Sequence, residues 1–353
     1  NLFVTVSFFQ TDILRQHNIE FDGSIKPNFE DGKYLADYFL HAETGNVAYL
    51  QKAEFFYRKR GDGSSTIDGA WSKKGKFSDV FSFGYIPMLQ SYKDKYGIIP
   101  QNIQWTVLYE LGWHLKTLLN SDFKLEGVLN DEEINNYHNL IRQTLSYIDD
   151  QHIIDFDLIG IWFLYKVGIM GLKGKKMPFH IAYIENIDRE KQQILISYHY
   201  TQEHDAAFLL DNKDIIPQYY KISNYSFAKK VFVHEVHAWI PYESLDSQFT
   251  ININGKTARL SLFGKQHNGW KVSDILSRFH PSKKYQTDGS WIIMDRDTQA
   301  DDNAEHFYRY MKKNHPEQKC YFALNQSSHD WKRLKKEGFT LLDFGSKEYE
   351  SKL

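Results

Sequence analysis

The sequence predicts a mixed α/β protein with several domains, and three observations point to that fold class. The chain has 353 residues, which is more than one ordinary domain holds, so two or three domains are expected. Apolar residues recur at helical spacing over residues 76–172, whereas short strand-like runs fill residues 179–265. Over residues 289–353, strand and helix patterns alternate in the order typical of a parallel sheet.

The first 75 residues carry one clear amphipathic helix among weaker patterns. Apolar and aromatic side chains at helical spacing predict a helix over residues 30–41, and Thr11 or Asp12 can cap a shorter helix that begins there. Short strands are expected at 19–22, 47–50 and 53–57. Residues 61–66 are a polar loop.

Residues 76–177 form the expected helical segment. Asn130 caps a helix whose first turn is acidic, Asp131-Glu132-Glu133. The apolar stretch 153–170 predicts one buried helix. The small, basic run 171–178 ends in Pro178 and is the best linker candidate.

Residues 178–285 are expected to form a β-rich module, and residues 286–353 the beginning of an open parallel sheet. The module's strands are predicted at 179–184, 193–200, 230–237, 249–253 and 257–263, with a hairpin turn at Asn254-Gly255. The last segment is expected to hold strands at 291–294, 320–324 and 340–344 and helices at 302–313 and 330–336.

Composition excludes several classes of protein. The net charge of −2 lacks the basic excess typical of nucleic-acid-binding proteins. The single cysteine, Cys320, excludes a disulfide framework and fits a reducing compartment; in a predicted strand it is expected in the core rather than as a nucleophile. No run of about 18 apolar residues is present to span a bilayer. A cytoplasmic location is therefore expected. The 23 Tyr and 25 Phe suit either sugar-stacking clefts or an aromatic core, and a core is the commoner use.

Both ends of the chain look cut. Asn1 leads directly into an apolar run, without the basic start of a signal peptide, and Leu353 follows a predicted strand. We therefore expect a fragment of a longer protein, with some active-site parts outside it.

The first candidate site lies at Glu30 and Asp31, which open the helix at 30–41. Two acids at a helix N-terminus can be simple capping charges. Alternatively, an ionised carboxylate there can act as a general base toward an acceptor hydroxyl. The segment Lys26-Pro27-Asn28-Phe29-Glu30-Asp31-Gly32 resembles the Pro-x-Phe-Glu-Asp segment of family-two inverting glycosyltransferases of the GT-A fold, especially those that build teichoic acids and capsules. The resemblance implies that Asp31 is the catalytic base and that Glu30 contacts the acceptor sugar.

A basic, serine-rich run follows about 25 residues later. Residues 55–66, Phe-Phe-Tyr-Arg-Lys-Arg-Gly-Asp-Gly-Ser-Ser-Thr, look like the segment of that family that closes over the donor diphosphate. Arginine forks and Gly-Ser donors suit phosphate oxygens, so the resemblance assigns donor binding to Arg58, Arg60, Ser64 and Ser65. A solvated strand end and a plain loop are the alternatives.

The resemblance also implies a divalent metal, Mg²⁺ or Mn²⁺. The family's Asp-x-Asp metal motif belongs to a first half that this chain lacks, so no metal ligand is assigned. On this interpretation residues 1–75 are the C-terminal part of a GT-A domain, and residues 76–177 are its helical tail.

The second candidate site is the acidic loop 295–306. It follows a predicted buried strand, where the loops of an open α/β sheet face the ligand crevice. Together with residues 321–324, 330–339 and 343–346, it resembles the start of the CDP-glycerol glycerophosphotransferase domain of teichoic-acid polymerases. The resemblance implies that residues 286–353 begin a Rossmann-like GT-B domain. Asp301, Asp302, Asn303 and His306 are then cleft candidates, with a plain capped helix as the equal alternative.

Two other patterns are weaker. His234-Glu235-Val236-His237 lacks the zincin spacing, and a strand sends its two histidines to opposite faces, so a metal site is not expected. The basic run 332–336 suits a solvated helix face, or contact with anionic lipid on the inner face of the membrane.

The function predicted from the sequence is an inverting, nucleotide-sugar-dependent glycosyltransferase fragment of a bifunctional surface-polymer synthase. Its partners would be the sugar donor, a polymer acceptor and CDP-glycerol. One alternative is that only the glycerophosphotransferase half of the parent is active. The other is a non-catalytic carbohydrate-binding segment built on the tyrosines of the β-rich module.

Overall fold

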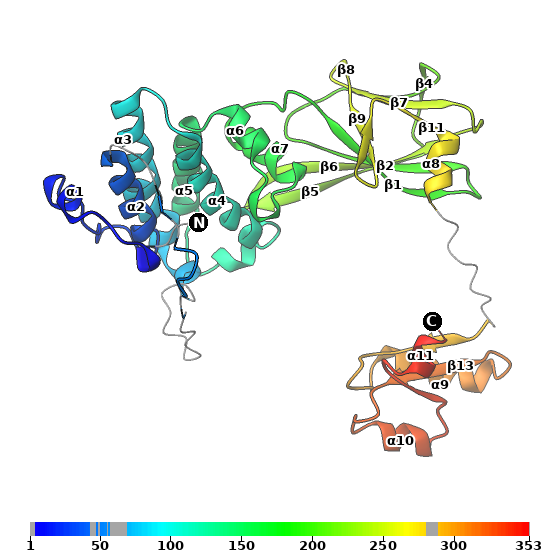
Figure 1. The fold of residues 1–353 in the computed structure, drawn as a ribbon. Helices are drawn as coiled ribbons and strands as arrows, with labels where there is room; N and C mark the ends of the chain where they lie inside the picture. The colour runs from blue at the N-terminus through cyan, green and yellow to red at the C-terminus, as the bar shows by residue number, and fades with distance from the viewer. Residues whose placement is uncertain are drawn as a thin grey trace. The chain divides into compact units, whose positions relative to one another are not determined.

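The computed structural model describes residues 4–42, 47–48, 50–54, 56, 69–279 and 289–352. The chain forms two compact units, Asn1–Phe279 and His280–Leu353. Each unit has its own core. The mixed α/β class is confirmed (Figure 1).

The first unit begins with a helical part (Figure 1). Its α-helices are α1 Thr11–Gln16, α2 Glu30–His41, α3 Ile86–Tyr96, α4 Gln101–Leu118, α5 Asp131–Ser146, α6 Asp150–Asp155 and α7 Phe163–Leu172. A π-helix, η4 Val80–Tyr85, leads into α3, and short 3₁₀ turns are η1 Val4–Val6, η2 Ala70–Ser72, η3 Lys74–Phe77, η5 Asp122–Leu125 and η6 Leu158–Gly160.

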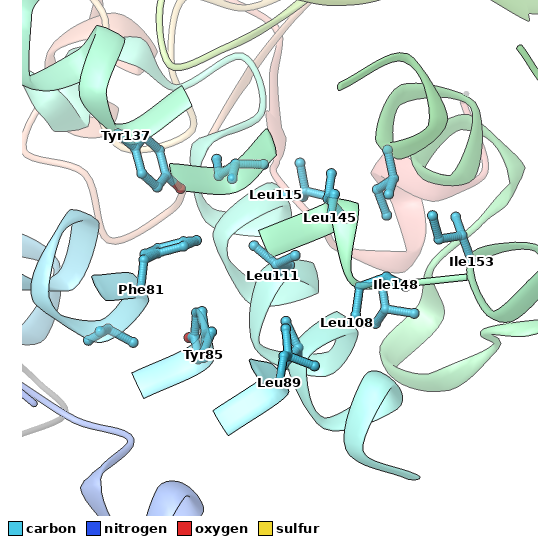
Figure 2. Close-up of a cluster of buried hydrophobic side chains, with 14 of the residues drawn as sticks. Phe81, Tyr85, Leu89, Leu108, Leu111, Leu115, Tyr137, Leu145, Ile148 and Ile153 are labelled. Carbon is cyan, nitrogen blue, oxygen red and sulfur yellow. The ribbon is translucent and has the colours of Figure 1, made fainter. Parts of the chain in front are cut away.

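Aromatic and aliphatic side chains from η4, α3, α4 and α5 meet in the helical core (Figure 2). Phe81, Tyr85 and Tyr137 are fully buried and make edge-to-face ring contacts. The predicted cap of α5 is confirmed, because the Asn130 side chain and Glu133 form a reciprocal capping box.

The single helix expected over 153–170 is wrong. The chain leaves the helix after Asp155, and Ile159 has a left-handed backbone with φ of 51° before α7 begins. The break lets Ile159 pack against Gly112 of α4, where a Cβ atom would lie only 2.5 Å from the Ile159 side chain. Lysine ammonium groups donate to carbonyls freed around the break, Lys116 to Ile159 and Lys166 to Ile154.

The β-rich part is built from two sheets. The larger has the order β10-β9-β1-β2-β6-β5, and the smaller has the order β11-β7-β3-β4 with β8 beside β7. The bounds are β1 Ile181–Asp188, β2 Gln193–Tyr200, β3 Ala206–Leu210, β4 Lys213–Ile215, β5 Tyr219–Phe227, β6 Lys230–Pro241, β7 Gln248–Ile253, β8 Lys256–Thr257, β9 Arg259–Leu262, β10 Lys265–His267 and β11 Trp270–Lys271, followed by α8 Val272–Arg278.

The hairpin turn predicted at Asn254-Gly255 is confirmed, since both residues have positive φ and join β7 to β8. The single strand expected over 257–263 is wrong. It divides at Ala258, because β8 pairs with β7 in one sheet and β9 pairs with β1 in the other. Ala258 is fully buried at that crossing.

A hairpin of the β-rich part completes the helical core. The turn between β5 and β6 is Ala228-Lys229, and both residues have positive φ. Phe227, Ala228 and Phe232 are buried among the helices, and the Ala228 carbonyl lies 3.0 Å from Nε2 of His138 on α5. The helical core therefore includes this hairpin, while the two sheets enclose a separate core.

The second unit is a three-stranded parallel sheet with helices. Strands β12 Trp291–Ile293, β13 Cys320–Leu324 and β14 Leu341–Asp343 are parallel, as predicted, and they pair in chain order. The helices are α9 Asn303–Asn314, α10 Trp331–Lys336 and α11 Lys347–Glu350.

Among the described residues, the strands predicted in the first 60 residues are not found, and residues 49, 55 and 57 of those predictions lie outside the described residues. Residues 19–22 are irregular, and the described residues of 47–50 and 53–57 are not in strands. Residues 19–22 are anchored instead through side chains: Ile19 is buried, and Phe21 stacks on Tyr34 of α2. Within the described residues, no helix has the length and apolarity to cross a membrane.

Candidate functional site

The candidate acids lie where α2 begins, and Phe29 fixes that point. Phe29 has a left-handed backbone with φ of 88° and a buried side chain. Its ring lies so close to Gly32 that a Cβ atom there would be 2.7 Å from a ring carbon, and Gly84 approaches the ring from η4. The ring also meets Tyr85 edge-on, with 4.6 Å between centroids. This packing sets the positions of Glu30 and Asp31.

The two acids have different surroundings. Asp31 is exposed, and its Oδ1 accepts a hydrogen bond of 2.8 Å from the Gly32 amide. Glu30 is half-buried, and its Oε2 has no hydrogen-bond partner among the described residues. Burial raises the pKa of Glu30, and the neighbouring charge of Asp31 adds to that effect. Asp31 is thus open to solvent, whereas Glu30 has an unused oxygen.

A buried lysine, Lys76, hydrogen-bonds to the loop that precedes α2. Lys76 is only 3% exposed, and its ammonium donates to Oδ1 of Asn28 at 3.1 Å. The same ammonium lies 4.0 Å from a carboxylate oxygen of Glu110 on α4 and 5.1 Å from the centroid of the Trp71 ring. Burial lowers the pKa of Lys76, and Glu110 opposes that shift. Lys76 therefore ties the loop before α2 to α4.

Glu110 of α4 is the acid nearest the Lys76 ammonium among the described ion pairs. Burial raises its pKa; Lys76 opposes this and the charge of Asp31 adds to it. Behind it lies His114, which is fully buried, with Nδ1 at 2.7 Å from the Tyr137 hydroxyl. Burial holds the pKa of His114 well below its usual range, so the ring is neutral.

Sequence reasoning missed Lys76, Glu110 and His114. Lys76 ends the run Lys73-Lys74-Gly75-Lys76, and nothing in that run shows which lysine is buried. The burial of His114 could have been predicted, because His114 follows Leu111 by three residues on the apolar face of α4.

The predicted donor-binding residues Arg58, Arg60, Ser64 and Ser65 lie outside the described residues. Over the part of the chain that the structure does describe, no three His, Cys, Asp or Glu side chains gather where they could hold a metal ion. The described residues therefore do not by themselves supply a divalent-metal site.

In the second unit, the acidic loop 295–306 is occupied with structural contacts. Asp295 follows β12 and accepts backbone hydrogen bonds from Asp302, Ala304 and Glu305 at the start of α9. Asp302 caps the amide of Asn303. The side chains of Asp301, Asp302, Asn303 and His306 are exposed.

Glu305 is the buried acid of this unit. It is 2% exposed and binds Arg333 of α10 with both carboxylate oxygens, at 2.7 and 2.9 Å, and Arg309 at 2.6 Å. The Arg333 guanidinium contributes most to holding the pKa of Glu305 at about 2. Arg333 thus belongs to an internal ion-pair network, while Lys332, Lys335 and Lys336 of the same helix are exposed.

The His234–His237 segment lies in β6, as predicted. Glu235 pairs with Nε2 of His199 on β2 at 3.3 Å, and the segment carries no metal-ligand cluster within the described residues. Cys320 at the start of β13 is partly buried.

No protein-family model matches the chain. Two relatives match about half of it. The minor teichoic acid biosynthesis protein GgaB of Bacillus subtilis (strain 168) is 32% identical over 162 residues, which are 45% of this chain and 17% of that protein. The minor teichoic acid biosynthesis protein GgaA of the same organism is 26% identical over 179 residues, 48% of this chain and 36% of that protein.

Part of this chain is similar to teichoic acid biosynthesis proteins. The chain spans about a sixth and about a third of the lengths of these two relatives.

Proposed function

We propose that this chain is part of a transferase that builds a teichoic-acid-type polymer, and that its front segment serves inverting glycosyl transfer from a nucleotide sugar. The similarity to GgaB and GgaA supports the polymer class. The observation that carries the chemistry is the acid pair at the start of α2, one carboxylate open to solvent and the other with an unused oxygen.

In the proposed step, Asp31 accepts the proton of an acceptor hydroxyl while that oxygen attacks the anomeric carbon of the donor. The bond to the leaving diphosphate breaks on the opposite face, so the configuration inverts and a nucleoside diphosphate departs. Asp31 suits this role because its carboxylate is exposed and lies in the first turn of α2, within reach of a bound acceptor. Glu30 would accept a hydrogen bond from a second hydroxyl of the acceptor through Oε2.

Arg58, Arg60, Ser64 and Ser65 are proposed to bind the donor diphosphate. A divalent metal, Mg²⁺ or Mn²⁺, would neutralise charge on that leaving group when bound, with its ligands supplied mainly outside this chain. Lys76 is proposed as a positioning residue, because its bond to Asn28 fixes the loop that presents the two acids. The proposed location is the cytoplasmic face of the membrane.

The second candidate function is glycerophosphate transfer from CDP-glycerol by the parent protein, with an inactive front segment. The parallel order β12-β13-β14 and its acidic loop favour it. The charges of Glu305, Asp330 and Arg333 hold this unit together, so any catalytic groups for that reaction are expected elsewhere in the parent.

The test is Asp31→Asn in the full-length parent protein, with incorporation of labelled sugar from the nucleotide donor as the readout. Loss of the general base should lower the rate by roughly 10²–10⁴-fold. The matched control is Asp12→Asn, which alters an exposed acid in the first turn of α1 and should leave the rate unchanged.

Glycerol phosphate incorporation, measured in the same preparations, separates the two candidates. The first candidate predicts that Asp31→Asn stops sugar incorporation and leaves glycerol phosphate incorporation intact. Sugar transfer at the wild-type rate by Asp31→Asn would refute Asp31 as the base.

A further inference from the structure

A pocket lies on the six-stranded sheet, far along the chain from Asp31. It has a volume of about 580 Å³, at the edge where β5 pairs with β6. Its walls include Leu195, Tyr219, Lys221, Ser223, His237 and Trp239.

The strand register places these side chains on one face of the sheet. Leu195 pairs with Trp239, and Trp239 pairs with Tyr219, so the three form one row across β2, β6 and β5. The next row on the same face contains His237 and Lys221. The alternate residues of β6, Val236 and Ala238, point to the other face and are fully buried in the core between the two sheets. The pocket therefore opens on the outer face of the sheet.

The first row offers aromatic surface. Tyr219 is 62% exposed, and its row neighbour Trp239 is partly exposed. Neighbouring rings on a strand pair present a broad apolar surface with polar edges, which suits the C–H faces of a sugar or polyol.

The second row offers a positive charge. The Lys221 side chain is exposed and has no ion pair or hydrogen bond with any residue that the structure describes. It lies two residues from Tyr219, about 7 Å along the strand. Ser223, two residues further, adds a hydroxyl to the pocket wall.

Two acids on the same face have partners among the described residues: Glu185 accepts a 2.7 Å hydrogen bond from the Ser197 hydroxyl, and Glu235 is bound on both sides. Glu235 accepts a 2.9 Å hydrogen bond from the Tyr225 hydroxyl and pairs with His199 at 3.3 Å. The His199 contact contributes most to lowering the pKa of Glu235. Among the described residues that line the pocket, Lys221 is the one with a permanent charge, and that charge complements an anionic chain.

We propose that this outer face binds a polymer of sugars or polyols joined by phosphodiesters, with Tyr219 and Trp239 against the carbon skeleton and Lys221 on a phosphate. The choice of polymer class rests on the proposed function, whereas the geometry of the pocket does not. Binding here would hold the growing or completed polymer away from the acids of α2, as a second site on the same unit.

The test is calorimetric titration of the whole chain with poly(glycerol phosphate) oligomers, and with maltohexaose as an uncharged probe. Tyr219→Ala should weaken binding of the charged oligomer at least tenfold. Lys221→Ala should weaken it severalfold and reduce its dependence on salt, without changing affinity for maltohexaose. The matched controls, Tyr310→Ala in the second unit and Lys265→Ala on β10, alter exposed residues outside the pocket and should leave binding unchanged.

Equal affinity of wild type, Tyr219→Ala and Lys221→Ala for the charged oligomer would overturn the proposal, as would no binding by wild type at millimolar oligomer. If Tyr219→Ala dissociates a protein dimer or larger assembly but still binds poly(glycerol phosphate), this face is a contact between copies of the chain. That result would also overturn the proposal. Asp31→Asn should bind the oligomer normally, so failure of this proposal and failure of the proposed transfer reaction remain distinguishable.

Discussion

The helices α2 and α9 both begin with acidic residues, yet their glutamates Glu30 and Glu305 have opposite surroundings. At α9, Asp295 and Asp302 bind backbone amides, and Glu305 is held by two arginines. At α2, Asp31 is exposed and, like Asp302, accepts a hydrogen bond from the amide of the next residue, whereas one oxygen of Glu30 is buried with no hydrogen-bond partner among the described residues.

A carboxylate that is fully hydrogen-bonded stabilises the fold, whereas a carboxylate with an unpartnered oxygen can still bind a substrate. A carboxylate whose lone pairs are all bound to amides or arginines has a lowered pKa and little capacity to accept another proton. A half-buried carboxylate with one oxygen left without a partner, such as that of Glu30, has a raised pKa, which is a pattern found at functional sites. On the contrast between Glu30 and Glu305, we propose α2 rather than α9 as the location of chemistry within this chain.

The largest stability effect is expected at Glu305. Replacing it by Gln removes the charge that pairs with Arg309 and Arg333, at a cost of about 3 kcal/mol in the free energy of unfolding of the second unit. Urea denaturation followed by Trp fluorescence measures this value. Glu348→Gln, which changes an exposed acid of the same unit, should alter it by less than about 0.5 kcal/mol.

The same residue predicts a pH dependence. The folded protein lowers the pKa of Glu305 from 4.5 to about 2. Its contribution to stability is therefore complete above about pH 4.5 and is lost as the pH falls toward 2. Glu305→Gln should flatten that part of the curve; an unchanged slope would show that the arginine pairs do not form.

A smaller effect is expected at Lys76, beneath the candidate site. Lys76→Met leaves Glu110 without its cation, and the first unit should lose about 2 kcal/mol. Lys74→Met is the control, because that lysine is exposed and pairs with Glu133 at the surface. The double variant Lys76→Met/Glu110→Gln should recover part of the loss; additive losses would mean that the two residues are not coupled.

The smallest effect on stability is expected at Glu30, and its pH dependence is opposite to that of Glu305. The folded protein raises the pKa of Glu30 above 4.5, mainly by burial. Its contribution to stability is therefore present at low pH and is lost as the pH rises through that raised pKa. Glu30→Gln should leave the first unit as stable at pH 7 as the wild type, or more stable by less than about 1 kcal/mol. A clear loss of stability would show that Glu30 has a structural partner.

Local rules were sufficient for much of the fold. The parallel order of β12, β13 and β14 followed from the alternation of strand and helix patterns, and the cap at Asn130 and the turn at Asn254-Gly255 from residue preferences. Strand β5 was missed because it is an edge strand whose first residues, from Tyr219, are mostly exposed, so apolar alternation is weak.

The candidate site was only partly accessible to sequence reasoning. Glu30 and Asp31 stand together in the sequence, but Lys76 binds Asn28 in the loop before them from 48 residues away, and Glu110 comes close to Lys76 only through tertiary packing. The split at Ala258 and the helix break before α7 also depend on neighbours distant in sequence, since they serve pairing with β1 and packing on α4.

The difference in pKa between Glu30 and Glu305 can be measured directly by nuclear magnetic resonance. Titration of ¹³C-carboxyl-labelled glutamate in the whole chain, with Glu30→Gln and Glu305→Gln spectra for assignment, gives both pKa values in one series. We predict a pKa above 4.5 for Glu30 and near 2 for Glu305. A pKa of Glu30 at or below 4.5 would show that its carboxylate is already satisfied and would contradict the account of α2 as the available site.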